Sequence, residues 1–251
     1  MRRIYLSVIF LLVPGFWTAQ AQTSASAASY LERGNSLYAG GDVDKALADY
    51  GTAITFSPGW ALAYYNRGIA RYAKGDLDGA IADFDVAIRI DPLYAAAYCW
   101  RSTVLHYRGD LDEAIGGYTK AIKINPRLAE AYCNRGAART AKGDLDGAIA
   151  DYNEGLRINP RSATAYSDRG SARLAQGHLQ EAVADFDKAI QIDDRKAVVY
   201  FNRGVALLDQ GRTAEADKDF ERCLKLDARL RAAVERVKEK PDLSPRAIRS
   251  H

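Results

Sequence analysis

Apolar residues recur along most of this chain with the three- and four-residue spacing of helices that bury one face. Residues 61–94 show the pattern well: one helix is predicted from Ala61 to Lys74, and a second starts after Asp76. Gly75 is expected to end the first helix in a left-handed conformation, and Asp76 to cap the second. The buried face of the second helix is predicted to comprise Leu77, Ala80, Ile81, Phe84, Ala87, Ile88 and Ile90.

This pattern returns every 34 residues. Asn-Arg-Gly occurs at 66–68, 134–136 and 202–204, and related triplets fill the positions between. One helix pair cannot bury its hydrophobic face alone, so a period of this length indicates units that stack. The predicted repeats are 27–60, 61–94, 95–128, 129–162, 163–196 and 197–230, followed by a capping helix at 231–240.

The repeats resemble the tetratricopeptide repeat (TPR) family. The motif of aromatic, Gly, Ala, aromatic, Ala and Pro appears as Tyr64, Gly68, Ala80, Phe84, Ala87 and Pro92, and it covers about four fifths of the chain. Period and resemblance together predict an all-α fold, a right-handed α-solenoid of six helix-turn-helix repeats. The sequence departs from the motif at Ser102, where the other repeats have Gly, and at Asp217, where they have an apolar residue.

The glycines within the first helices predict close helix crossings, because glycine there costs about 1 kcal/mol relative to alanine. We expect each to face the small residue of the second helix. Those residues are Ala46, Ala80, Ala114, Ala148, Ala182 and Ala216.

The resemblance implies a concave groove lined mainly by the first helices. Such a groove would bind an extended or helical segment of another protein through aromatic anchors. Alternatively, these aromatic side chains simply pack against the next repeat. The predicted groove residues are Tyr38, Tyr65, Asn66, Tyr72, Trp100, Tyr107, Asn134, Phe201 and Asn202.

An arginine precedes each of these glycines, and Ser102 in the third repeat, at 33, 67, 101, 135, 169 and 203. A buried guanidinium needs an acid, and the sequence offers one in the second helix of five repeats. Those acids are Asp49, Asp83, Asp151, Asp185 and Asp219. We predict a structural Arg–Asp ladder. Gly117 replaces the acid in the third repeat, so Arg101 is expected to turn to an acid of a neighbouring repeat or to solvent.

No catalytic, metal-binding or cofactor-binding pattern is present: the three histidines lie far apart, and neither a phosphate-binding loop nor a nucleophile elbow occurs. The formal net charge is +3, and the repeats themselves are slightly acidic, which argues against a nucleic-acid surface. We therefore expect a non-enzymatic protein-interaction scaffold without cofactors. The alternative is a protein that holds a glycan or a small apolar molecule on its Tyr/Trp groove.

Residues 1–21 read as a signal peptide, with Arg2 and Arg3 before an apolar run and Ala19-Gln20-Ala21 as the cleavage site. An uncleaved leader would instead anchor the protein to a membrane. We expect the protein to be exported, most simply to a bacterial periplasm. Cys99, Cys133 and Cys223 are expected as free thiols, with a strained Cys99–Cys133 disulfide as the alternative. Residues 241–251 are expected to be disordered.

Overall fold

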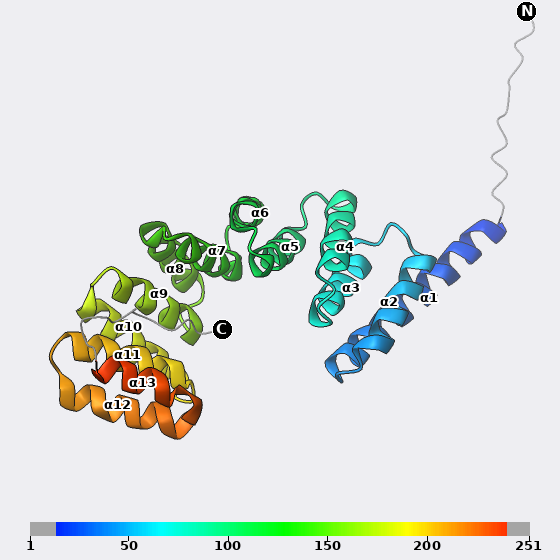
Figure 1. Cartoon of the computed structure of the whole chain (residues 1–251). Coiled ribbons are helices and arrows are strands. Elements are labelled where there is room, and N and C mark those ends of the chain that lie inside the picture. Colours follow the sequence, from blue (N-terminus) through cyan, green and yellow to red (C-terminus); the bar gives the residue numbers. More distant parts are fainter. Residues whose placement is uncertain (1–13, 240–251) are drawn as a thin grey trace, which may run out of the picture. The chain divides into compact units, whose positions relative to one another are not determined.

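A computed structural model describes the backbone of residues 14–239 and the side chains from Ser26 onward, and every regular element in this range is helical (Figure 1). Two helices follow one another in each predicted repeat. The helices are α1 (Pro14–Ala39), α2 (Val43–Phe56), α3 (Ala61–Ala73), α4 (Leu77–Ile90), α5 (Ala95–Arg108), α6 (Leu111–Ile124), α7 (Ala129–Lys142), α8 (Leu145–Ile158), α9 (Ala163–Ala175), α10 (Leu179–Ile192), α11 (Ala197–Asp209), α12 (Thr213–Leu226), the 3-10 turn η1 (Ala228–Leu230) and α13 (Arg231–Glu239). The fold is thus the all-α helical-repeat solenoid that the sequence predicted.

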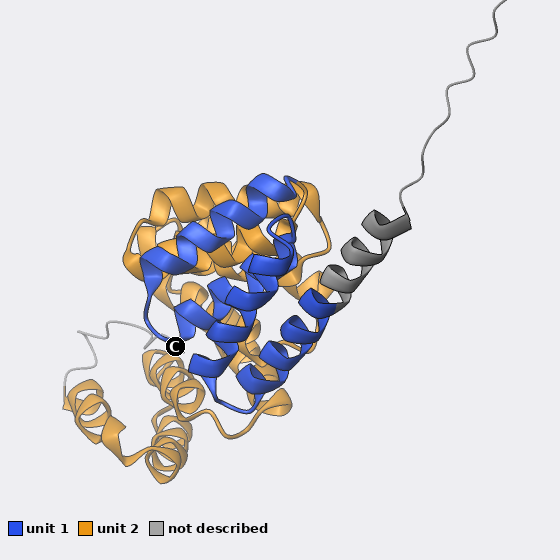
Figure 2. Ribbon diagram, turned by 90° about the vertical axis from the view of Figure 1, so that its right-hand side faces the viewer, with its two compact units in different colours: residues 1–92 blue, residues 93–251 orange. Residues whose placement is uncertain are grey.

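The chain divides into two compact units, residues 1–92 and 93–251, which we call unit 1 and unit 2 (Figure 2). Unit 1 holds α1 to α4, and unit 2 holds α5 to α13. Within each unit the two helices of a repeat pack together, and the second helix also packs on the first helix of the following repeat. Each unit is therefore a stack in its own right.

The turn inside each repeat has the predicted chemistry. Gly75 adopts φ +81°, a left-handed conformation that suits glycine, and the five equivalent glycines do likewise. Asp76 caps α4 by accepting a hydrogen bond from the Gly79 N–H at 3.0 Å. Asp42 and Asp144 cap α2 and α8 in the same way. Asp110 does not cap α6, because its side chain pairs with Arg108. In repeats five and six His178 and Arg212 replace the aspartate and form no side-chain cap.

The glycines of the first helices face aromatic rings, which corrects the expectation of an alanine partner. A Cβ added to Gly68 would approach the Phe84 ring to 2.8 Å, and one added to Gly170 would approach the Phe186 ring to 2.9 Å. Both distances are too short for a real contact. The ring leaves room only for a hydrogen atom at these positions, which accounts for the recurring glycine.

Helix α13 covers the end of unit 2. Val234 and Val237 are buried in the same apolar cluster as Phe220, and Lys238 pairs with Asp217 at 2.5 Å. The departure at Asp217 thus supplies an anchor for this helix. The predicted tail, 241–251, and most of the predicted leader lie outside the described residues, and both stay predictions. Within the described part, no helix is both long and apolar enough to cross a bilayer.

Candidate partner-binding surface

The predicted Arg–Asp ladder is present. In each of five repeats the Nε and Nη2 atoms of the arginine donate to the two oxygens of the aspartate, at 2.6–2.9 Å. The aspartates are 2–7% exposed. The pairs are Arg33–Asp49, Arg67–Asp83, Arg135–Asp151, Arg169–Asp185 and Arg203–Asp219. These arginines are therefore part of the helix packing and do not form a row of anion sites.

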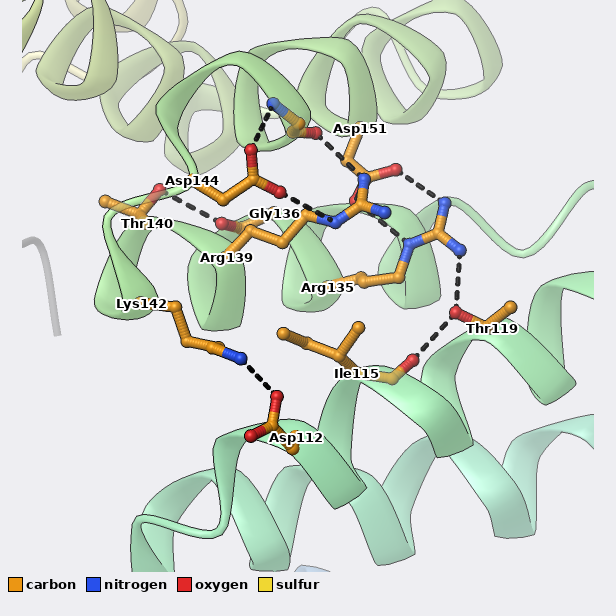
Figure 3. A network of polar contacts seen from close by, with 11 residues as sticks. Asp112, Ile115, Thr119, Arg135, Gly136, Arg139, Thr140, Lys142, Asp144 and Asp151 are labelled. Carbon is orange, nitrogen blue, oxygen red and sulfur yellow. Dashed lines mark hydrogen bonds and ion pairs between the residues drawn. The ribbon is translucent and has the colours of Figure 1, made fainter.

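A second arginine, one helical turn further on, joins the ladder in three repeats. Figure 3 shows the fourth repeat, where Arg139 Nη1 donates both to the Gly147 carbonyl at 3.1 Å and to Asp151 Oδ2 at 2.9 Å. Arg71 and Arg173 bind Asp83 and Asp185 in the same way. Sequence reasoning missed this role, although the spacing of four residues from the first arginine marks it.

The ladder also links neighbouring repeats. Arg135 Nη1 donates to Thr119 Oγ1 at 2.9 Å (Figure 3), and the equivalent atoms of Arg169 and Arg203 donate to Asn153 and Asp187, each at 2.6 Å. Each acceptor lies on the second helix of the preceding repeat. Hydrogen bonding to Asp219 is the main reason that the pKa of Arg203 is raised, so this guanidinium stays charged at any relevant pH.

The asparagines of the Asn-Arg-Gly triplets latch one repeat to the previous one. Asn66 donates to Asn35 at 2.8 Å, Asn134 to Thr103 at 3.4 Å, and Asn202 to Ser171 at 3.2 Å. Donors and acceptors both recur every 68 residues, which explains why this triplet skips alternate repeats. Asn66, Asn134 and Asn202 were predicted to line the groove. Their amide nitrogens make hydrogen bonds within the stack, but Asn66 and Asn134 remain partly exposed, so groove lining stays a prediction for these two.

The third repeat breaks the ladder, as the sequence indicated. Arg101 Nη2 donates to Glu113 Oε1 at 2.7 Å, an acid of its own repeat that the sequence analysis did not name. A Cβ on Gly117 would overlap with Ser102 Oγ, so the serine occupies the space that an aspartate would need. Ser102 is fully buried, and its hydroxyl has no hydrogen-bond partner among the described residues.

Phe201 and Asn202 were predicted to line the groove, but both are buried, so the prediction is wrong for these two residues. Phe201 is 4% exposed, and its ring lies 6.0 Å from the Phe220 ring, while Asn202 is 0% exposed. Nearly the whole circumference of α11 is covered, because its side chains join the large apolar cluster of the last two repeats and α13. Phe201 and Asn202 are therefore not accessible to a partner protein.

The other predicted aromatic residues remain partly exposed. Tyr38, Tyr65 and Tyr72 are half-buried on the first helices of unit 1. Trp100 is half-buried and Tyr107 is 72% exposed, both on α5 of unit 2. These residues form two sets, one in each unit. Each set presents aromatic surface on first helices, as expected of partner-binding residues.

Among the described residues, no group of His, Cys, Asp and Glu is arranged to hold a metal ion. The three cysteines are free thiols, as predicted. Burial raises the pKa of both Cys99 and Cys133 to about 12, so neither thiol is a ready nucleophile at neutral pH.

Comparison with known proteins agrees with this architecture. A family model described as "TPR repeat" matches residues 103–139, 136–177 and 170–211, and two described as "Tetratricopeptide repeat" match residues 31–95 and 197–229. No curated protein matches the sequence.

Several solved structures are similar. YrrB, described as a TPR protein with an unusual peptide-binding site, shares 19% identity and a TM-score of 0.63 over 76% of this chain and 97% of that one. MamA shares 26% identity with a TM-score of 0.58, over 68% of this chain and 94% of MamA. PilF of Pseudomonas aeruginosa shares 15% identity with a TM-score of 0.76, over 88% of this chain and 99% of PilF. At their identities, YrrB and PilF show the fold alone.

Proposed function

The chain belongs to the tetratricopeptide repeat family, whose members generally serve as protein-interaction scaffolds, and we propose that it is a non-enzymatic adaptor that binds a segment of a partner protein. The proposed contact surfaces lie on the first helices of each unit. Their anchors are Tyr38, Tyr65 and Tyr72 in unit 1, and Trp100 and Tyr107 in unit 2. Phe201 and Asn202 are left out because they are buried.

The exposure of these aromatic residues is the observation that carries the proposal. Aromatic side chains that stay half-exposed on first helices, such as Tyr65 and Tyr72, retain apolar area that a partner can cover. The YrrB structure is described as having a peptide-binding site, which supports the same use of this fold here. We further propose that the protein is exported, as its leader-like N-terminus suggests, and works in a bacterial periplasm.

Site-specific photocrosslinking tests the proposal. A photoreactive phenylalanine analogue at Tyr72 or Tyr107 should give one discrete adduct with a protein of the cell envelope. The same analogue at Ile192, an exposed residue after which α10 ends, is the control and should give none. The Tyr65→Ala/Trp100→Ala double variant should fold normally and lose the adduct.

Two results would contradict the proposal. An adduct that forms equally well at Ile192 would move the contact away from the first helices. A change in tryptophan fluorescence on adding saccharides, with no protein adduct at either tyrosine, would favour the alternative of a ligand-binding groove.

A further inference from the structure

The loops that join one repeat to the next differ in charge between the two units. In unit 2, the segments 120–130, 154–164, 188–198 and 222–232 together hold twelve Lys/Arg and five Asp/Glu. We call these four segments the loop edge. The corresponding segments of unit 1, 52–62 and 86–96, hold one basic and one acidic residue. The slight acidity of the repeats as a whole therefore hides a strongly basic edge.

The turns within the repeats of unit 2 have the opposite excess. Segments 108–116, 142–150, 176–184 and 210–218 hold four Lys/Arg and eight Asp/Glu. Opposite charges are thus separated to the two ends of the helices. A protein that only needed solubility would intersperse them.

One arginine recurs at the same place in all four loops of the loop edge. Each is exposed and lies two residues before the next helix: Arg127, Arg161, Arg195 and Arg229. A helix N-terminus carries a partial positive charge, so a cation beside it is unfavourable by about 0.3–1 kcal/mol. Lys123 lies in the last turn of α6, where a cation stabilises the helix. The four arginines lie before helix N-termini, so helix stability does not explain them.

The four arginines differ in their partners. Arg195 pairs with Asp193 at 3.2 Å, and Arg229 pairs with Asp227 through two bonds of 2.9 Å. The matching residues in repeats three and four are Asn125 and Asn159. These asparagines accept only the backbone N–H of the arginine, at 3.1 and 3.2 Å.

Neither Arg127 nor Arg161 has a side-chain partner in the described part of the chain. Lys120 and Lys123 add two exposed charges on α6, also without an acid partner there. We call Lys120, Lys123, Arg127 and Arg161 the basic cluster. Positive charge without an acid partner among the described residues also continues into repeats five and six of the loop edge, at Lys188, Lys196, Lys225 and Arg231. What sets repeats three and four apart is that the recurring arginine itself is unpaired there.

We propose that the basic cluster binds the phosphate headgroups of anionic phospholipids. Segments 120–130 and 154–164 expose no large apolar side chain among the described residues, whereas a specific protein interface has an apolar centre. They also contain no aromatic residue on which single-stranded bases could stack. Adsorption to a charged lipid surface needs only the clustered cations. The apolar run at residues 4–17 directs the chain to a membrane in either interpretation of the leader.

Vesicle co-sedimentation of the full chain tests the proposal, with vesicles of equal parts phosphatidylglycerol and phosphatidylcholine against pure phosphatidylcholine. Binding should depend on the anionic lipid and weaken as salt rises above about 0.1 M. Each Lys or Arg near such a surface contributes about five-fold in affinity, so Arg127→Ala/Arg161→Ala should bind about 25-fold more weakly. Every variant carries the same leader, and the neutral vesicles report its contribution.

Arg195→Ala/Arg229→Ala is the matched control. It removes the same charges from the same repeat positions, but these arginines are already paired with aspartates, so fewer contacts with headgroups are lost. Binding should weaken clearly less than in Arg127→Ala/Arg161→Ala. Asn125→Asp/Asn159→Asp should instead weaken binding several-fold, because it supplies the missing acids and deletes nothing. Circular dichroism confirms that each variant is folded.

Equal loss in the control pair would overturn the proposal, and so would equal binding to neutral vesicles. Retention by a DNA duplex without binding to anionic vesicles would assign the cluster to nucleic acid instead. The readout does not depend on a protein partner, so the proposed scaffold function can fail while this inference holds.

Discussion

Repeats three and four follow one another in unit 2, yet they pack their first helix on their second in different ways. In repeat four, Gly136 leaves room for the Tyr152 ring, and Arg135 reaches Asp151. In repeat three, Gly117 replaces the aspartate, the Ser102 hydroxyl occupies the space where a side chain at 117 would begin, and Arg101 pairs with Glu113. The difference teaches that the ladder residues change as a set. A serine in the first helix excludes the aspartate, and without the aspartate the arginine needs another acid.

The largest expected effect is at Asp151. Asp151→Ala should lower the free energy of unfolding by about 3–5 kcal/mol, because it leaves Arg135 and Arg139 without their shared buried carboxylate. Urea denaturation followed by circular dichroism measures the loss. Glu113→Ala is the matched change in repeat three. Its side chain is 54% exposed, so the expected cost is below about 1 kcal/mol. Equal costs would show that burial of the pair is not what matters.

The next largest effect is expected at two glycines, where the same substitution by alanine should change stability in opposite directions. Gly136→Ala places a Cβ 3.0 Å from the Tyr152 ring and 3.2 Å from the Ala148 carbonyl oxygen, and should destabilise by about 1–3 kcal/mol. Gly116→Ala in repeat three meets nothing within 4 Å inside a helix, and should stabilise by about 1 kcal/mol. Thermal unfolding of the two variants gives opposite shifts in Tm if the comparison holds, and shifts of the same sign if it does not.

A double-mutant cycle can convert repeat three to the packing of repeat four. Gly117→Asp alone should destabilise because the new side chain overlaps with Ser102. Combined with Ser102→Gly, it should recover and give Arg101 a buried acid, with a coupling energy of about 1–3 kcal/mol. Denaturation of the four proteins measures this coupling. If the two effects simply add, positions 102 and 117 are independent, and the pairing of serine with glycine in repeat three has no energetic basis.

The smallest effect is expected at the latch between these repeats. Asn134→Ala removes the 3.4 Å bond to Thr103 and should cost about 0.5–1.5 kcal/mol. Amide hydrogen exchange should quicken mainly in α5 and α7, the two helices that the latch joins. Asn202→Ala offers a comparison at a fully buried latch, where the cost should be higher. A uniform rise in exchange across unit 2 would argue against a local role for the asparagine.

Much of the fold was predictable because its determinants lie close together along the chain. The glycine turns, the caps at Asp76 and Asp144, and the Arg–Asp pairs all connect residues within one helix pair, separated by at most 16 positions. A repeated pattern at fixed spacing makes such contacts visible without coordinates. Even the exception in repeat three could be read from Gly117.

The candidate site was less predictable because it depends on which faces the neighbouring elements cover. Phe201 has the same repeat position as Tyr65, but α11 is buried almost all round beside α12 and α13. The family pattern gives both residues the same role, and only the packing at the end of the stack separates them.

The sequence by itself thus determined the period, the helices, the turns and the ladder, since each follows from local spacing and the need to pair a buried charge. Tertiary structure decided that rings rather than alanines exclude a Cβ at the helix crossings and that Asn134 joins two neighbouring repeats. These outcomes depend on contacts between residues that the chain brings together only when the repeats stack, and net charge or periodicity does not encode that proximity.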